Sequence, residues 1–316
     1  MSRTIFLAGG SGFIGAEVCR ACVAAGDVVL ALCRSQSSAR KMETLGAVPV
    51  EGDLLEKGTW QEHARDAECV AHLAQPTFFG GRITTKRAEA YREGRARMDA
   101  NLLGALDPLK IKRVVYVSGT CYYGNLGTAL CDETATPRPC SIGRYIVDTV
   151  ERLDAWTKNG LPIVTAFPGV VYGPGSWFEE YIFAPLARGK RLLAFSGRSP
   201  TVSPIHVGDC GRAIAHLLTH GGVGERYFLV DDKPVQWSVL QMLTAGALAV
   251  TPRFLTLPRW LVATFMGPIM AEGLIEMDAA LSNTKLRALR FEHQYPTVDA
   301  GIPAVVVELR NCAPQT

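Results

Sequence analysis

Three glycines near the start of the chain constrain its fold more than any other feature. Gly9, Gly12 and Gly15 recur at intervals of three. They follow the apolar, strand-like run 3–8 and open the helix-like run 12–25. At such a junction, glycines allow a tight turn, a close approach of the backbone to a ligand, and close packing of the helix on the sheet. The free N–H groups and partial positive charge of the helix start suit a diphosphate, so this pattern predicts a dinucleotide site.

The next two hundred residues continue the alternation of strands and helices. Further strand-like runs fall at 27–33, 47–53, 67–74, 113–119, 162–169 and 226–230. Helix-like runs fall at 39–46, 58–65, 84–107, 142–159 and 206–220. Short apolar strands separated by helices pair in parallel, with helices on both faces of the sheet. We therefore predict an α/β fold: a Rossmann doubly wound parallel sheet with a smaller, mainly helical C-terminal substrate domain.

The regular alternation of strands and helices ends after residue 170, where Pro, Trp and Phe become frequent. One further strand–helix pair returns to the sheet before the chain leaves it again. We predict that residues 1–174 plus 204–232 form the NAD(P)-binding Rossmann domain. Residues 175–203 plus 233–316 would then form the substrate-binding domain.

The end of the second strand indicates which dinucleotide the chain prefers. Enzymes that bind NAD place a carboxylate there for the ribose 2′-hydroxyl, but this chain has Cys33, Arg34 and Ser35. The planar guanidinium of Arg34 suits a 2′-phosphate, although a solvated surface charge is the other interpretation. We expect NADP(H) to be favoured over NAD(H).

The other predicted coenzyme contacts lie at carboxyl ends of strands, where open α/β sheets bind ligands. Asp53 would accept a hydrogen bond from the adenine amino group, and Ala74 and Gln75 would pass beneath the coenzyme. The full predicted set is Gly9, Ser11, Gly12, Phe13, Ile14, Gly15, Arg34, Ser35, Asp53, Leu54, Leu73, Ala74, Gln75 and Pro168.

Several short motifs occur in one order along nearly the whole chain. They are "AGGSGFIG" (8–15), "GDL" (52–54), "HLA" (72–74), "VSGTCYYG" (117–124), "PGVVYGPG" (168–175), "PIHVGDCGRAI" (204–214) and the segment 282–302. Together they resemble the extended short-chain dehydrogenase/reductase superfamily, in its NAD-dependent epimerase/dehydratase group. The resemblance implies a Rossmann domain, a bound dinucleotide and a substrate cleft between the two domains.

The chain departs from the catalytic pattern of that family. The family uses a tyrosine, a lysine four residues later, and a Ser or Thr that holds the substrate oxygen; the ammonium helps to lower the pKa of the phenol. Here Tyr145 is followed four residues later by Thr149. Aligning the Gly-Arg pair of this helix with that of the family instead puts Ile142 and Ile146 at the two positions. Neither register contains a lysine.

Three interpretations follow. The first is a reductase or dehydrogenase with relocated acid–base groups, in which Tyr145, Tyr122 or Tyr123 gives the proton and Thr120 or Ser118 orients the substrate. The second is a lyase, isomerase or cyclase with a structural dinucleotide. The third is a non-catalytic NADP(H)-binding protein. For Tyr145, ordinary packing of a helix aromatic on the sheet stays open beside catalysis.

The remaining features bound the substrate and the partners. Aromatic residues in 172–183 and 253–266 suit a bulky, rather apolar small molecule, or the core of the smaller domain. The net charge of +3 is spread along the chain and gives no case for nucleic acid, and the histidines offer no metal site. Nine cysteines, mostly in apolar runs, indicate reduced thiols and a cytoplasmic protein. We expect no membrane partner, although surface contact by 254–271 stays open, as does a homodimer.

Overall fold

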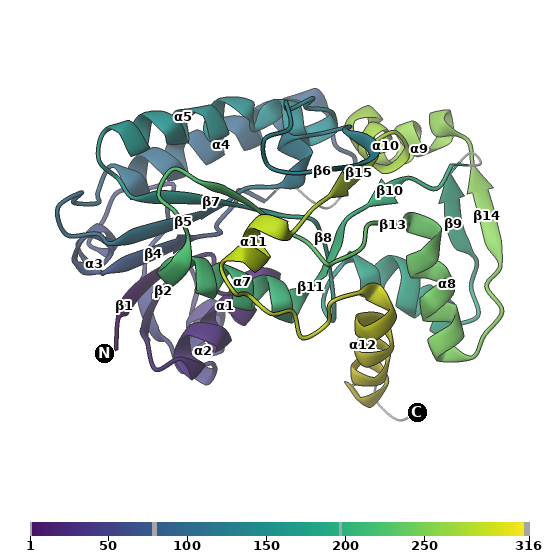
Figure 1. Cartoon of the computed structure of the whole chain (residues 1–316), viewed down its shortest axis with the longest axis horizontal. Coiled ribbons are helices and arrows are strands. Elements are labelled where there is room, and N and C mark those ends of the chain that lie inside the picture. The colour runs from purple at the N-terminus through teal and green to yellow at the C-terminus, as the bar shows by residue number, and fades with distance from the viewer. Residues whose placement is uncertain (1, 78–80, 196–197, 313–316) are drawn as a thin grey trace.

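A computed structural model describes residues 2–77, 81–195 and 198–312 of the chain. Its main feature is a seven-stranded sheet of order β12-β7-β5-β4-β1-β2-β3 (Figure 1). All six pairings in this sheet are parallel. The strands are β1 (Thr4–Ala8), β2 (Val28–Cys33), β3 (Val48–Glu51), β4 (Cys69–His72), β5 (Arg113–Val117), β7 (Ile163–Pro168) and β12 (Arg226–Leu229). The predicted doubly wound parallel sheet is confirmed.

Helices cover both faces of the sheet (Figure 1). One face carries α1 (Phe13–Ala24), α2 (Gln36–Thr44) and α7 (Val207–His220). The other carries α3 (Trp60–Asp66), α4 (Thr85–Leu103) and α5 (Val147–Lys158). Because successive side chains of a strand point to opposite faces, Ile5 and Leu7 of β1 enter the first core, whereas Phe6 and Ala8 enter the second. Burial on both sides explains why the strands read as continuous apolar runs.

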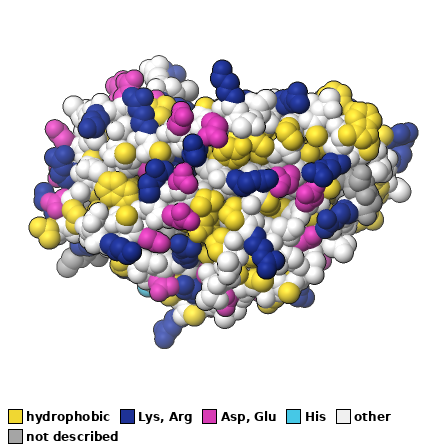
Figure 2. All heavy atoms as spheres, turned by 90° about the horizontal axis from the view of Figure 1, so that it is seen from above, with side chains coloured by type: hydrophobic (Ala, Val, Ile, Leu, Met, Phe, Trp, Pro, Cys, Tyr) yellow, Lys and Arg dark blue, Asp and Glu magenta, His cyan; other side chains and the backbone are white. Residues whose placement is uncertain are grey.

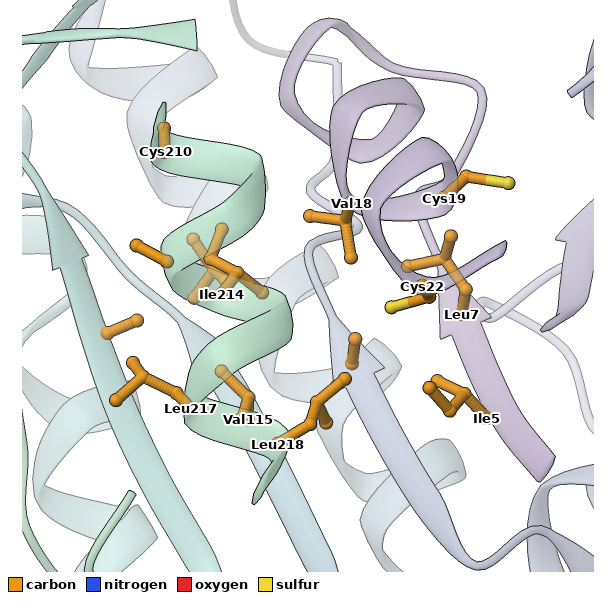
Figure 3. Close-up of a cluster of buried hydrophobic side chains, with 14 of the residues drawn as sticks. Ile5, Leu7, Val18, Cys19, Cys22, Val115, Cys210, Ile214, Leu217 and Leu218 are labelled. Carbon is orange, nitrogen blue, oxygen red and sulfur yellow. The ribbon is translucent and has the colours of Figure 1, made fainter. Parts of the chain in front are cut away.

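The packing of α1 against α7 closes one face of the sheet (Figure 3). Val18 and Cys22 of α1 meet Ile214 and Leu217 of α7 above β1 and β5. Burial raises the pKa of the Cys22 thiol to about 12, which keeps it protonated at neutral pH. This thiol therefore acts as an apolar core group and not as a nucleophile.

The smaller half of the molecule has its own apolar core. That core joins Phe178, Leu240, Ile302 and neighbouring side chains. Its helical elements are a π-helical turn η3 (Glu179–Phe183), α6 (Ala184–Ala187), α8 (Trp237–Leu248), α9 (Arg259–Met266), α10 (Pro268–Ile275) and α12 (Val298–Cys312). Its strand pairs are β9 (Leu192–Phe195) with β14 (Phe254–Leu257), and β10 (Thr201–Val202) with β13 (Val235–Gln236).

Two further strand pairs connect the halves. They are β8 (Val170–Tyr172) with β11 (Pro204–His206), and β6 (Gly127–Cys131) with β15 (Ala279–Leu281). Beyond β15, α11 (Thr284–Ala288) returns to the main sheet, because Leu286 and Phe291 pack in the same core as β1 and α7. The boundaries of the two domains stay a prediction, and the segment around α11 lies on the side of the main sheet.

Candidate active site

The glycine loop between β1 and α1 forms a cradle with no space for side chains. Gly9 has φ +90°, and a Cβ there would lie 2.6 Å from the amide nitrogen of Ala74. A Cβ on Gly15 would lie 2.1 Å from the carbonyl oxygen of Gly9. Gly12 precedes α1, and no side chain caps the helix. The first amides of α1 are thus left for an anionic ligand, so the loop fits a dinucleotide diphosphate.

The next coenzyme candidates surround the ends of β2 and β3. Nη1 of Arg34 lies 3.9 Å from Oδ2 of Asp53, and the Arg34 side chain is 61% exposed. Ser35 caps α2: its hydroxyl accepts a hydrogen bond from the amide of Ser38 at 3.2 Å and lies 3.0 Å from the hydroxyl of Ser37. A guanidinium beside several hydroxyls offers donors for a phosphate.

The ends of β4 and β7 complete this edge of the sheet. The amide of Leu73 donates to the carbonyl of Ala8 at 2.8 Å, which holds the segment after β4 beside the glycine loop. Gln75 is exposed there, whereas Leu54 and Pro168 are buried. Gly9, Ala74 and Gln75 therefore lie together at one edge of the sheet, whereas Leu54 and Pro168 are buried at the ends of β3 and β7.

The segment with the predicted catalytic tyrosine is not the single helix that the sequence indicated over 142–159. A 3-10 turn, η2 (Ser141–Tyr145), comes first, and the regular helix α5 begins at Val147. Gly143 lies against another 3-10 turn, η1 (Thr120–Tyr122): a Cβ on Gly143 would lie 1.8 Å from the carbonyl oxygen of Cys121. This close approach of two backbones holds η2 out of the helix, and it brings Tyr145 next to the segment of Thr120.

The other predicted catalytic residues divide into two groups. Ser118 and Thr120 follow β5 at the carboxyl edge of the sheet, and both are buried. Tyr122 is directed elsewhere: its hydroxyl accepts a hydrogen bond from Arg226, the first residue of β12, at 3.4 Å. The first residues of parallel strands lie at the edge opposite to the coenzyme edge, so the phenol of Tyr122 points away from the glycine loop.

The sequence interpretation missed Tyr91 of α4. Its phenol donates to Oε1 of Gln75 at 2.9 Å, and burial raises its pKa, so it stays protonated at neutral pH. One turn later, Arg95 donates through Nη2 to the carbonyl of Val117 at 2.8 Å, just before Ser118. The sequence contained a sign of this site: Tyr91 and Arg95 are a tyrosine and a cation four residues apart, which is the spacing of the family's tyrosine and lysine, but on a different helix.

A buried polar network anchors α4 below this edge. Nε2 of His72 lies 2.9 Å from Oδ1 of Asp99, whose carboxylate also accepts from the phenol of Tyr116 at 2.9 Å. Nε of Arg95 donates to the hydroxyl of Tyr116 at 2.7 Å. Burial lowers the pKa of His72, so its imidazole is neutral. His72 is thus a packed histidine, and its partners Asp99 and Tyr116 also contact Arg95, which bonds to the carbonyl of Val117.

The surroundings of η1 and η2 are apolar. Ile142, Tyr145 and Ile146 belong to one cluster with Phe167 of β7 and Ile269 of α10. Two contacts fasten α10 over η2: the hydroxyl of Ser141 donates to the carbonyl of Ile269 at 2.5 Å, and Arg144 forms an ion pair with Glu272. In the register that aligns the Gly-Arg pair, the tyrosine and lysine positions are therefore isoleucines within an apolar environment, and in the other register they are Tyr145 and Thr149.

The aromatic residues of 172–183 and 253–266 differ in how far they are buried. Phe178 and Phe183 are buried in the core of the smaller half, and Trp177 stacks on Trp237 with ring centroids 4.9 Å apart. Trp260 and Phe265 are exposed. Phe178, Phe183 and Trp177 of the first segment therefore belong to the core of the smaller half, which is one of the two interpretations that the sequence allowed.

A cavity of about 640 Å³ opens on the outer side of α1. Phe13, Lys41, Pro174 and His206 lie along its wall. The predicted catalytic residues are not among those that line it, so we do not assign the substrate to this cavity.

Comparison with known proteins identifies the family. The sequence profile of the NAD dependent epimerase/dehydratase family matches residues 5–229, which is more than two thirds of the chain. The chain belongs to this family. Its predicted resemblance is thereby confirmed, and so are the nucleotide-binding fold and an oxidoreductase or epimerase/dehydratase type of enzyme.

Proteins similar to this chain include two reductases and an epimerase. The 4-hydroxy-2-methyl-3-oxo-4-farnesyl-3,4-dihydroquinoline-1-oxide ketoreductase of Stigmatella aurantiaca is 29% identical over 73% of this chain and 69% of its own length. The 2-alkyl-3-oxoalkanoate reductase of Shewanella oneidensis is 26% identical over 78% and 67%. The UDP-glucose 4-epimerase of Thermus thermophilus, solved with NAD, shares the fold with a TM-score of 0.79 at 20% identity, covering 98% of this chain and 100% of its own.

Proposed function

We propose that this family member is an NADP(H)-dependent reductase that acts on a carbonyl or enone of a bulky, apolar small molecule. One observation carries the proposal: η2, which contains Tyr145, packs closely against η1 at Gly143 and Cys121, at the sheet edge where Ser118 and Thr120 follow β5 and the glycine loop follows β1. The two reductases named above support it, since the names of their substrates include farnesyl and alkyl groups. Arg34 supports the preference for NADP(H).

The chain's own residues divide the work. The first amides of α1 would hold the diphosphate, and Arg34 with Ser35 would hold the 2′-phosphate. When bound, the reduced nicotinamide supplies a hydride to the substrate. Ser118 and Thr120 orient the substrate oxygen, and Tyr145 donates the proton that turns this oxygen into a hydroxyl group. Tyr91, which stays protonated, is the second phenol at this edge and the alternative donor.

The missing lysine favours one direction of the reaction. A phenol ionises near neutral pH only where a neighbouring cation lowers its pKa, and neither register of the family pattern supplies a lysine here. Oxidation of an alcohol would need the phenolate as a base, whereas reduction of a carbonyl needs the neutral phenol. The site is therefore suited to reduction.

Loss of NADPH absorbance with a panel of apolar ketones, β-keto acids and enones tests the proposal. We expect turnover in the wild type and at least a hundredfold lower kcat in Tyr145→Phe, because general acid catalysis contributes about 10²–10⁴-fold. Tyr122→Phe serves as the control and is expected to keep its activity, since that phenol faces Arg226. If Tyr91→Phe is the inactive variant instead, the donor is Tyr91. Equal activity of all variants would contradict a tyrosine donor.

A second function is favoured by the absence of the family's lysine in either register, Tyr145 with Thr149 or Ile142 with Ile146. A site without the phenol–ammonium pair suits a lyase, isomerase or cyclase that holds its dinucleotide structurally. Tight NADPH binding without NADPH consumption, together with conversion of a substrate to an isomer or a cleavage product, would establish this alternative. Tight NADPH binding with no conversion of any substrate would favour a non-catalytic NADP(H)-binding protein.

A further inference from the structure

β9, β14 and α9 lie at one end of the molecule (Figure 1), and several of their large apolar side chains are exposed. Trp260 is 69% exposed and Phe265 70%, and Leu193 and Leu255 are 38% and 43% exposed. We call these four residues the apolar ridge. Seen from above, hydrophobic side chains gather at this end of the molecule, with Lys and Arg side chains beside them (Figure 2).

The elements under the ridge make it one surface. Leu193 and Leu255 are register partners in the parallel pair of β9 and β14, so their side chains stand together on one face. Leu257 lies two residues further on the same face, and it packs with Val262 of α9. The face of β9 and β14 therefore continues into α9. Val262 packs in the cluster beneath α9, whereas Trp260 and Phe265 of the same helix are exposed, and being five residues apart they project about 140° from each other around the helix axis.

Cations lie at both ends of the strand pair β9 and β14, and carboxylates are missing from the two segments that carry the ridge. Residues 184–195 and 249–271 contain no Asp or Glu. All basic residues of these two segments are exposed. We call them the basic rim, which consists of Arg188, Lys190, Arg191, Arg253 and Arg259. Arg259 pairs with Glu276, but the three cations of 188–191 form no ion pair within the described part of the chain.

We propose that the apolar ridge and the basic rim dock the protein on the surface of an anionic bilayer. Exposed Trp and Phe side chains enter the boundary between headgroups and acyl chains, and surrounding Lys and Arg side chains contact anionic headgroups. A second copy of the chain fits this surface less well, because a two-fold contact would bring the two basic rims against each other. None of the helices over 2–77, 81–195 and 198–312 is long and apolar enough to cross a bilayer, so the proposal is contact with the surface.

The docking surface adjoins the candidate active site. The amide of Ile83 donates to the carbonyl of Met266 at the end of α9, which ties this helix to the start of α4. The following helix, α10, covers η2 through Ser141 and Ile269. An apolar substrate dissolved in the bilayer would thus lie next to the cluster around Tyr145. This last link rests on the proposed function, whereas docking itself does not.

Flotation of the full chain with lipid vesicles tests the docking proposal without coenzyme or substrate. The probes are vesicles of phosphatidylcholine alone and of phosphatidylcholine with an equal part of phosphatidylglycerol. We expect flotation with the anionic vesicles, reduced at high salt because surface charges are screened. The double variant Trp260→Ser/Phe265→Ser should bind at least tenfold more weakly, because two apolar side chains no longer leave water. Leu109→Ser, at a side chain 97% exposed on the Rossmann side, is the matched control and should bind like the wild type.

A second set of variants tests the basic rim. Arg188→Gln/Lys190→Gln/Arg191→Gln should weaken binding about a hundredfold, since each cation near an anionic surface contributes about fivefold. The same change at three exposed cations elsewhere, Lys57, Lys110 and Arg152, should have much less effect. All replaced side chains are exposed, so folding is retained, and thermal melting verifies it. Absence of flotation, or flotation that survives the ridge variant, overturns the proposal. A dimer that the ridge variant dissociates, without any vesicle binding, assigns the ridge to a second copy instead.

Discussion

Replacement of Arg34 by Ala separates the two coenzymes. The Arg34 side chain is 61% exposed, and its guanidinium lies 3.9 Å from the carboxylate of Asp53. Because such a surface ion pair contributes less than about 1 kcal/mol, Arg34 is available to bind a phosphate. Hydrogen bonds to a charged group contribute about 1.5–3 kcal/mol, or about 10- to 150-fold in affinity. Solvent screening at this exposed site puts the expected loss near the lower end, at about tenfold for NADPH, with little change for NADH.

The assay is fluorescence titration of both reduced coenzymes at low and high salt. The loss for NADPH should shrink as salt screens the phosphate. Arg152→Ala, an exposed arginine on α5, is the matched control and should change neither affinity. Asp53→Asn adds a further test: it should weaken both coenzymes alike if its carboxylate holds the adenine. Equal losses of NADPH and NADH in Arg34→Ala would refute the assignment of Arg34 to the 2′-phosphate.

Two further predictions concern the glycine loop and a buried carboxyl group. Gly15→Ala should abolish binding of both coenzymes in the same titration, because its Cβ would lie 2.1 Å from the carbonyl oxygen of Gly9. Gly246→Ala on α8 is the control: its Cβ would meet nothing within 4 Å, so this variant should bind both coenzymes normally. Normal binding by both variants would contradict the assignment of the glycine loop to the diphosphate. Burial raises the pKa of Asp231 from 3.8 to about 8, so the folded state holds a proton that the unfolded state releases. The free energy of unfolding should therefore fall as the pH rises toward 8, by up to about 1.4 kcal/mol per pH unit. Thermal melting of the wild type and of Asp231→Asn between pH 6.5 and 8 isolates this effect, because the histidines whose pKa burial lowers from 6.5 contribute alike to both proteins. Stability should fall less with pH in Asp231→Asn, and identical slopes would contradict the burial effect.

The sheet and the coenzyme edge followed from local patterns. The strand-like runs are buried on both faces and are therefore continuously apolar, which makes them visible in one dimension. The glycine spacing is equally local, since Gly9 and Gly15 meet within the same turn. The limits of the single helix expected over 142–159 were wrong at its start, because the contact that breaks it comes from Cys121, more than twenty residues earlier.

The candidate catalytic groups show the opposite case. The hydrogen bond between Tyr91 and Gln75 joins two elements, and the direction of Tyr122 depends on Arg226, which is far along the chain. Periodicity does not encode such pairs. The exposure of Trp260 was also hidden, because an apolar residue in an apolar segment has the same letter whether it is covered or not.

What the sequence determined by itself is the alternation of elements, the phosphate loop and the absence of the family's lysine, since each depends on residues that are neighbours along the chain. Only the tertiary structure decided which hydroxyl groups lie at the coenzyme edge, which apolar side chains share a cluster with Tyr145, and which aromatic side chains stay uncovered. Those outcomes arise where distant segments meet, because the side chains that fill or leave a space come from elements whose contacts no local pattern specifies.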